Sequence, residues 1–332
     1  MTAAIGLAGL GALQGCGGDD GPARSPDERA AVRYPLPGDR VFPEGIAVEK
    51  STGALFVGST TDGTIYRTDA RGGEAEVFLP GGRDGRTSAT GLKVDERGRL
   101  WVAGRFTERA FVYDIRSRRL IARRRAPRVE PSFSPRDEPS LVNDLTFAGG
   151  ATYLTDSFRP VVYRVRTAPD GTVGPMEPWL RLQRTVARYR KGFNLNGISA
   201  SDDGRFLIAA GTDSGELFRI DVRTREVERV DLGGATLRTA DGVLLDGSTL
   251  LVVREEPGEV VPVRLSSDGR RGEVGRGFGR TELDFPTTLA ERDGRVFVVN
   301  SQFDRADAPR LPFTVSGLPL PRAVARGGRA SG

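Results

Sequence analysis

Short hydrophobic stretches recur along most of this chain, and turns containing glycine and aspartate separate them. The segment 192–220 shows the pattern clearly: a stretch at 196–200, an Asp-Gly turn, a strongly apolar stretch at 205–211, a second glycine turn, and a third stretch from 216. No segment keeps a helical periodicity over three or more turns. This pattern predicts an all-β protein with many turns.

The same pattern of three strand-like stretches occurs six times. Each copy begins with a polar residue where an ordinary strand favours a β-branched one. The six opening residues, spaced by 46, 53, 53, 45 and 46 positions, are Glu44, Thr90, Asn143, Asn196, Asp241 and Thr287. A period of roughly forty to fifty residues with about four strands in each unit is typical of a propeller blade. We therefore predict a six-bladed β-propeller.

The sixth repeat lacks an obvious fourth strand, because the sequence after Leu320 is rich in arginine and glycine. A strand-like segment at 31–36 can supply the missing strand, so we predict that this N-terminal strand closes the ring in the last blade. The expected organisation is an export signal and tether at 1–21, a linker with the closing strand at 22–40, the propeller at 41–320, and a disordered tail at 321–332.

The first sixteen residues are apolar but too few to span a bilayer as a helix. They end in Leu-Gln-Gly-Cys at 13–16, which resembles a bacterial lipoprotein signal whose cysteine, here Cys16, is lipidated. Two features depart from that signal: no Lys or Arg precedes the apolar stretch, and Gln14 is unusual at its position. The alternative is a disordered apolar tail. We expect an exported protein of the cell envelope or extracellular space, with membrane contact only through a lipid anchor at Cys16.

Composition excludes several kinds of chemistry. The chain has no histidine and a single cysteine, so it cannot contain a Ser-His-Asp triad, a Cys-His pair or a histidine-based zinc site. Any metal must be held by oxygen ligands, which favours a hard cation. The net charge is +5, but basic and acidic residues are mixed along most of the chain. We expect a monomer that does not bind nucleic acid.

In a propeller the first strand of each blade lines the central axis, so the six opening residues become neighbours. Four of them, Glu44, Asn143, Asn196 and Asp241, offer carboxylate or amide oxygens with a total charge of −2. A divalent cation neutralises that charge, and water completes its ligand shell. The alternative is that each polar residue only caps its own strand.

Four motifs resemble the senescence marker protein/gluconolactonase family, within the calcium-dependent phosphotriesterase-like superfamily of six-bladed propellers. The motifs are Pro43-Glu44-Gly45, Val142-Asn143-Asp144, Leu195-Asn196-Gly197 and Ala240-Asp241-Gly242. The resemblance covers roughly 41–316 and implies a Ca²⁺ ion, or another divalent cation such as Mn²⁺ or Zn²⁺, held by Glu44, Asn143, Asn196 and Asp241. It also implies that Asp241 is the catalytic base. Leu141 stands where gluconolactonases of the family carry an arginine for sugar hydroxyls.

We expect an enzyme: a metal-dependent hydrolase of small lactones or esters, in which the metal polarises the carbonyl and a carboxylate activates water. Two longer insertions, 127–140 and 184–193, lead directly into the strands of the two asparagines. Their side chains Phe133, Arg136, Tyr189 and Phe193 suit an aromatic or anionic ester as a substrate rim. The alternative is a non-enzymatic propeller with a structural calcium ion that binds a ligand or an envelope partner.

Overall fold

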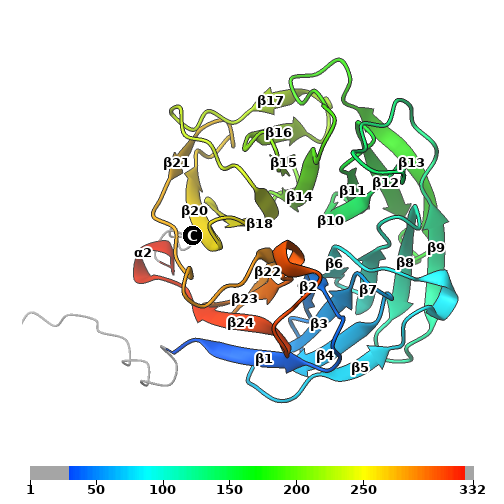
Figure 1. Ribbon diagram of the computed structural model, residues 1–332. Helices are drawn as coiled ribbons and strands as arrows, with labels where there is room; N and C mark the ends of the chain where they lie inside the picture. The colour runs from blue at the N-terminus through cyan, green and yellow to red at the C-terminus, as the bar shows by residue number, and fades with distance from the viewer. Residues whose placement is uncertain (1–29, 326–332) are drawn as a thin grey trace, which may run out of the picture.

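The computed structural model describes residues 30–325 and arranges them as six four-stranded antiparallel blades around a central axis (Figure 1). Blade 1 contains β2 (Pro43–Val48), β3 (Ala54–Ser59), β4 (Ile65–Asp69) and β5 (Glu76–Leu79). Blade 2 contains β6 (Leu92–Val94), β7 (Arg99–Ala103), β8 (Arg109–Asp114) and β9 (Leu120–Arg125). Blade 3 contains β10 (Val142–Ala148), β11 (Ala151–Asp156), β12 (Val161–Thr167) and β13 (Val173–Arg181).

Blade 4 contains β14 (Leu195–Ala200), β15 (Phe206–Gly211), β16 (Leu217–Asp221) and β17 (Val227–Arg229). Blade 5 contains β18 (Ala240–Asp246), β19 (Thr249–Arg254), β20 (Glu259–Leu265) and β21 (Gly272–Val274). Blade 6 contains β22 (Pro286–Arg292), β23 (Arg295–Asn300), β24 (Phe313–Pro319) and, as its outer strand, β1 (Val32–Leu36). The prediction of a six-bladed propeller is confirmed.

The N-terminal strand β1 closes the ring, as the sequence predicts. It pairs antiparallel with β24, from Val32 opposite Gly317 to Leu36 opposite Phe313. Tyr34 and Leu36 are each only 1% exposed, because they pack into the apolar layer between blade 6 and blade 1. The first and last parts of the described chain therefore hold one blade together, and no blade keeps an open fourth position.

Five of the six innermost strands, all but β6, carry a β-bulge at the opening position. In β10, Val142 pairs with Asp156 and Leu145 pairs with Leu154, so three steps on the inner strand match two on its neighbour. The same shift of one residue occurs in the inner strands β2, β14, β18 and β22. A bulge turns the side chain of its extra residue away from the regular alternation. Each of these bulges contains the polar opening residue of its blade.

Glycines follow several opening residues because adjacent inner strands approach closely there. A Cβ added at Gly45 would lie 2.0 Å from Thr90 O in blade 2, and one added at Gly197 would lie 2.2 Å from Asp241 O in blade 5. Real Cβ atoms do not approach so closely, so a side chain at either position requires the inner strands to separate. The polar-plus-glycine pairs in the sequence thus mark where neighbouring blades touch.

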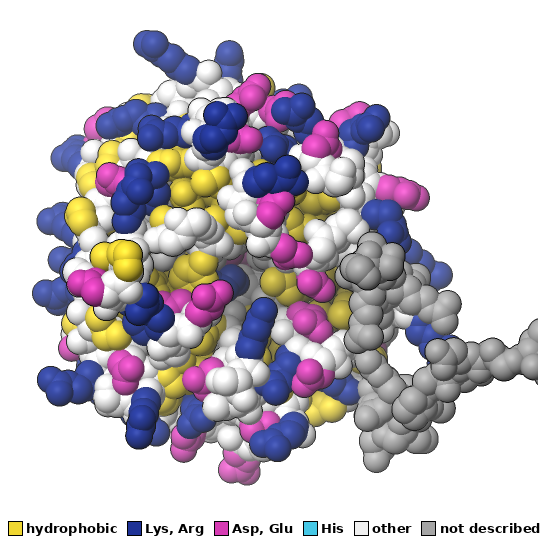
Figure 2. Space-filling model, turned by 180° about the vertical axis from the view of Figure 1, so that it is seen from behind, with side chains coloured by type: hydrophobic (Ala, Val, Ile, Leu, Met, Phe, Trp, Pro, Cys, Tyr) yellow, Lys and Arg dark blue, Asp and Glu magenta, His cyan; other side chains and the backbone are white. Residues whose placement is uncertain are grey.

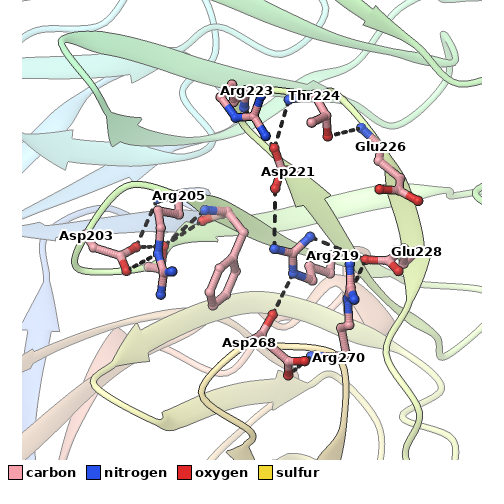
Figure 3. A network of polar contacts seen from close by, with 12 residues as sticks. Asp203, Arg205, Arg219, Asp221, Arg223, Thr224, Glu226, Glu228, Asp268 and Arg270 are labelled. Atoms are coloured by element: carbon pink, nitrogen blue, oxygen red, sulfur yellow. Dashed lines mark hydrogen bonds and ion pairs between the residues drawn. The ribbon is translucent and has the colours of Figure 1, made fainter.

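Arginines join the outer parts of neighbouring blades. Arg219 of β16 donates from Nε to Asp268 O (2.6 Å) in the loop that follows β20, and it pairs with Glu228 (3.3 Å; Figure 3). Side chains that also donate to carbonyl groups of the next blade are Arg97, Arg99, Arg124 and Arg292. On the face drawn in Figure 2, basic and acidic side chains are interspersed. These arginines therefore link neighbouring blades through backbone carbonyl groups.

The described residues also contain three short helical turns: η1 (Arg83–Gly85), η2 (Phe303–Arg305) and α2 (Arg322–Ala325). The last of these, α2, lies in the segment 321–332 that was predicted to be a disordered tail. Within 30–325, no helix is both long and apolar enough to cross a membrane. The lipidation site predicted at Cys16, the export signal and the end of the tail lie outside the described residues.

Candidate metal centre

The four predicted ligands lie at corresponding bulges of blades 1, 3, 4 and 5, and all are buried, with exposures of 2–5%. Each presents a buried oxygen without a hydrogen-bond partner within the described chain. These atoms are Glu44 Oε2, Asn143 Oδ1, Asn196 Oδ1 and Asp241 Oδ1. Buried polar atoms normally find partners, since leaving one unpaired costs about 1–3 kcal/mol. Four such oxygens at equivalent positions of one ring fit the ligand set of a hard cation.

Hydroxyl groups of the neighbouring strand orient both amides. Asn143 Nδ2 donates to Ser157 Oγ (2.9 Å), and Asn196 Nδ2 donates to Thr212 Oγ1 (3.2 Å). Ser157 Oγ itself donates to Leu195 O (2.8 Å), and Thr212 Oγ1 donates to Ala240 O (2.9 Å).

A hydroxyl group has one hydrogen to donate, and in Ser157 and Thr212 it is engaged with a backbone carbonyl. Each hydroxyl can therefore only accept from the amide. The NH₂ group must face the hydroxyl, which leaves the amide oxygen as the free group. The network consequently fixes which end of Asn143 and of Asn196 is available to a cation.

The two threonines of the ring behave differently from the four oxygen donors. Thr287 Oγ1 donates to Glu44 O (2.8 Å), as does Thr288 Oγ1 (2.6 Å). Thr90 Oγ1 lies 2.9 Å from Asn143 O, to which it donates. These hydroxyls hold the backbone of Glu44 and Asn143, whose side chains are candidate ligands. The six opening positions thus divide into four candidate donors and two supports.

Burial governs the electrostatics of the carboxyl groups. It raises the pKa of Asp241 well above its ordinary range, and the nearby Glu255 and Glu44 raise it further. Burial likewise raises the pKa of Glu44, with Asp144 adding to the shift. A cation held between Glu44 and Asp241 would favour their charged forms and reverse both shifts.

Three further residues belong to this region. Glu255 follows β19 and lies next to Asp241, and burial raises the pKa of Glu255 to about 7. Asp144 Oδ2 accepts from Ile198 N (3.1 Å) and its Oδ1 has no partner among residues 30–325. Arg105 lies near Glu44.

Glu255 was missed because it lies just after the second strand of its blade and not on the inner strand that carries the opening residue. The residue after the second strand also faces the ring: Ser157 and Thr212 occupy that position in blades 3 and 4, and Glu255 occupies it in blade 5. Polarity at this position in consecutive repeats is the signal that could have found it.

The predicted rim residues lie in two settings. Tyr189 is buried at 6% exposure and donates from its hydroxyl to Asp156 O (2.7 Å), with the half-buried ring of Phe133 packed edge-on 6.3 Å away. Phe193 is half-buried and its ring lies 5.5 Å from that of Phe158, whereas Arg136 is exposed. Contact of these residues with a substrate stays a prediction.

The donor set is chemically mixed. Within the described residues, His, Cys, Asp and Glu side chains alone do not form a cluster of three or more that could hold a metal. The candidate centre depends on the amide oxygens of Asn143 and Asn196 as much as on the two carboxylates. Neutral and anionic oxygens together, with a formal charge of −2, match a divalent oxygen-seeking ion such as Ca²⁺. The residues present therefore fit the cation that the family resemblance implies.

Comparisons with known proteins support the fold. No protein-family model and no curated protein matches the sequence, so the family resemblance is not confirmed at the level of sequence. Among solved structures, the calcium-binding protein regucalcin from Agrobacterium tumefaciens is similar with a TM-score of 0.55 and 16% identity, over 85% of this chain and 90% of that one.

Two more solved structures are similar over most of their length. A luciferin-regenerating enzyme gives a TM-score of 0.57 at 13% identity, over 87% of this chain and 95% of that one. Virginiamycin B lyase from Staphylococcus aureus gives 0.56 at 10% identity, over 88% and 99%. At these identities the similarity shows the fold alone: these proteins are propellers, and this chain forms a propeller of six blades.

Proposed function

We propose that this propeller is a divalent-metal-dependent hydrolase of lactones or esters. The observation that carries the proposal is the ring of unpartnered buried oxygens on Glu44, Asn143, Asn196 and Asp241. The similarity to a calcium-binding propeller and to an enzyme of the same fold supports it. When bound, a divalent cation would supply Lewis acidity toward an ester carbonyl.

The residues of the chain would supply the remaining functions. Glu44, Asp241 and the two amides would hold the ion, and Ser157 and Thr212 would keep the amide oxygens turned toward it. Asp241 would take a proton from the attacking water, the role that the family resemblance assigns to it. Glu255, next to Asp241, would share that proton.

Burial of the donors supports a second candidate function. Because the four side chains are nearly inaccessible, an ion held by them could be structural, and the propeller could then bind a ligand or an envelope partner without turning it over. The two functions differ in one measurable respect: a structural ion stabilises the protein but supports no turnover.

The experiment is a hydrolase panel on the full chain supplied with Ca²⁺, Mn²⁺ or Zn²⁺, using lactones, aryl esters and phosphotriesters. Asp241→Asn should abolish turnover while leaving the fold intact. Asp246→Asn is the matched control, because Asp246 is the exposed carboxylate at the opposite end of the same strand β18. That variant should keep wild-type activity.

Three outcomes separate the possibilities. Metal-dependent turnover that Asp241→Asn removes supports the hydrolase. A protein that EDTA destabilises but that hydrolyses nothing in the panel is the non-enzymatic propeller. If EDTA has no effect on thermal unfolding and elemental analysis finds no metal, the metal centre itself is refuted. Export and anchoring through Cys16 also remain proposals, which mass spectrometry of the mature N-terminus would test.

A further inference from the structure

Arg105 occupies an unusual backbone position beside the candidate metal centre. It follows β7, and its N–H and C=O both bond to Val142, the residue before Asn143 (3.1 and 3.3 Å). Its φ of +54° lies in the left-handed region, which a non-glycine residue adopts at a cost of order 1 kcal/mol or more. Two backbone bonds thus fix Arg105 in a strained conformation next to a ligand-bearing strand.

The guanidinium group of Arg105 is half-buried but has no strong partner. Within residues 30–325 it forms no hydrogen bond and no ion pair, and its Cζ lies over the Phe106 ring, 4.4 Å from the ring centroid. Its charged neighbours, at longer range, are Glu44, Glu138 and Arg136. By contrast, the buried Arg99 reaches both Asp95 and a backbone carbonyl. Arg105 therefore retains its donors for another group.

Aromatic rings continue from Arg105 across three blades. The ring of Phe106 stacks 6.3 Å from Phe158, and Phe158 lies 5.5 Å from Phe193. Phe158 follows Ser157, which holds the amide of Asn143, and Phe193 precedes the strand of Asn196. A row of rings thus leads from the guanidinium group of Arg105 to the segments next to the two asparagine-bearing strands. Its middle ring, Phe158, is fully buried, whereas Phe106 and Phe193 are half-buried.

We propose that Arg105 makes the site select substrates by their charge. The site takes esters or lactones that have a flat apolar body and an anionic group such as a carboxylate. The guanidinium group of Arg105 binds this anionic group beside the aromatic row. This inference rests on the proposed function, because it assumes that the bound molecule is a substrate. The binding subsite itself can be tested without measuring turnover. A divalent ion would offset the charges of Glu44 and Asp241, so Arg105 would no longer be needed to balance Glu44 and its charge could serve a bound anion. A planar guanidinium group binds a carboxylate through two parallel hydrogen bonds.

The test measures binding of benzoate and its neutral counterpart benzamide to the Ca²⁺-loaded full chain by calorimetry. Wild type should bind benzoate more tightly, and Arg105→Gln should weaken benzoate binding by about tenfold or more while leaving benzamide unchanged. Arg105→Lys should give an intermediate loss, because lysine keeps the charge but not the planar pair of donors.

Arg118→Gln is the matched control. Arg118 also has a positive φ, of 57°, and also lies over a phenylalanine, Phe78, at 4.9 Å, but it is 48% exposed and belongs to the outer part of blade 2. Its substitution should leave benzoate binding unchanged.

Two results would overturn the inference: equal affinity of wild type for benzoate and benzamide, or undiminished benzoate binding in Arg105→Gln. If Arg105 served only as a counter-ion of Glu44, its loss would change Ca²⁺ affinity and leave the preference for benzoate intact, which also overturns it. A protein that binds benzoate through Arg105 but hydrolyses nothing would refute the hydrolase and keep the anion subsite.

Discussion

The orientation of Asn196 provides a sharp test of the candidate metal centre. Thr212→Val keeps the shape of the side chain but removes the hydroxyl that accepts from Asn196 Nδ2 (3.2 Å) and donates to Ala240 O (2.9 Å). The variant leaves a buried donor and a buried acceptor unpaired, which should cost about 1–3 kcal/mol for each group. The amide also loses the contact that turns its oxygen toward the other donors.

Loss of this orienting contact should weaken Ca²⁺ binding by about 10–100-fold, the usual effect of removing a partner of a metal ligand. Calorimetric titration of EDTA-treated protein with Ca²⁺ measures it. Thr60→Val is the control, because Thr60 lies just after the second strand of blade 1 and donates only to Phe42 O (2.7 Å). Equal Ca²⁺ affinity in wild type and Thr212→Val, or an equal loss in Thr60→Val, would refute the reasoning.

Burial raises the pKa values of Glu44 and Asp241, so the metal-free protein loses stability as pH rises through their titration. Ca²⁺ should therefore raise the melting temperature more at pH 8 than at pH 5, and a gain that shrinks as pH rises would contradict this. A chain lacking residues 1–40 loses two buried side chains of β1, each worth about 1.5–3 kcal/mol, so its denaturation midpoint should fall sharply. A chain that starts at residue 30 keeps β1 and is the control, and its midpoint should not fall. Gly197→Ala should cost about 1–3 kcal/mol in the same assay because its Cβ would meet Asp241 O, and an unchanged midpoint would disprove that close approach.

Most of the fold could be predicted because its information is local. Each blade carries the alternation of short apolar strands and turns, and the period of the repeats sets the number of blades. Closure by β1 was predictable for a related reason: the sixth repeat lacked a strand, and a strand-like segment was left over. The opening residues were equally accessible, because a shared bulge repeats at the same point of the pattern.

The rest of the site depends on contacts between blades, which no local pattern records. Thr90 and Asn143 look equivalent in the sequence, yet the hydroxyl of Thr90 donates to a carbonyl of the next blade, while the amide oxygen of Asn143 has no hydrogen-bond partner among residues 30–325. Arg105 sits in a turn whose left-handed backbone the sequence does not signal. Tyr189 reads as a loop aromatic, but its insertion folds back onto the propeller and buries it.

The repeated bulge lets the backbone of the ring stay the same while the opening side chains, which provide the chemistry, differ from blade to blade. Because the bulge sets where each opening side chain points, a blade can exchange one donor for another, as Asp241 and Asn196 illustrate, with the same backbone beneath it. Such a ring can change its net charge one position at a time, and with it the ion or ligand it prefers. The glycines and threonines beside it are less free to change, because they hold adjacent blades at contact distance.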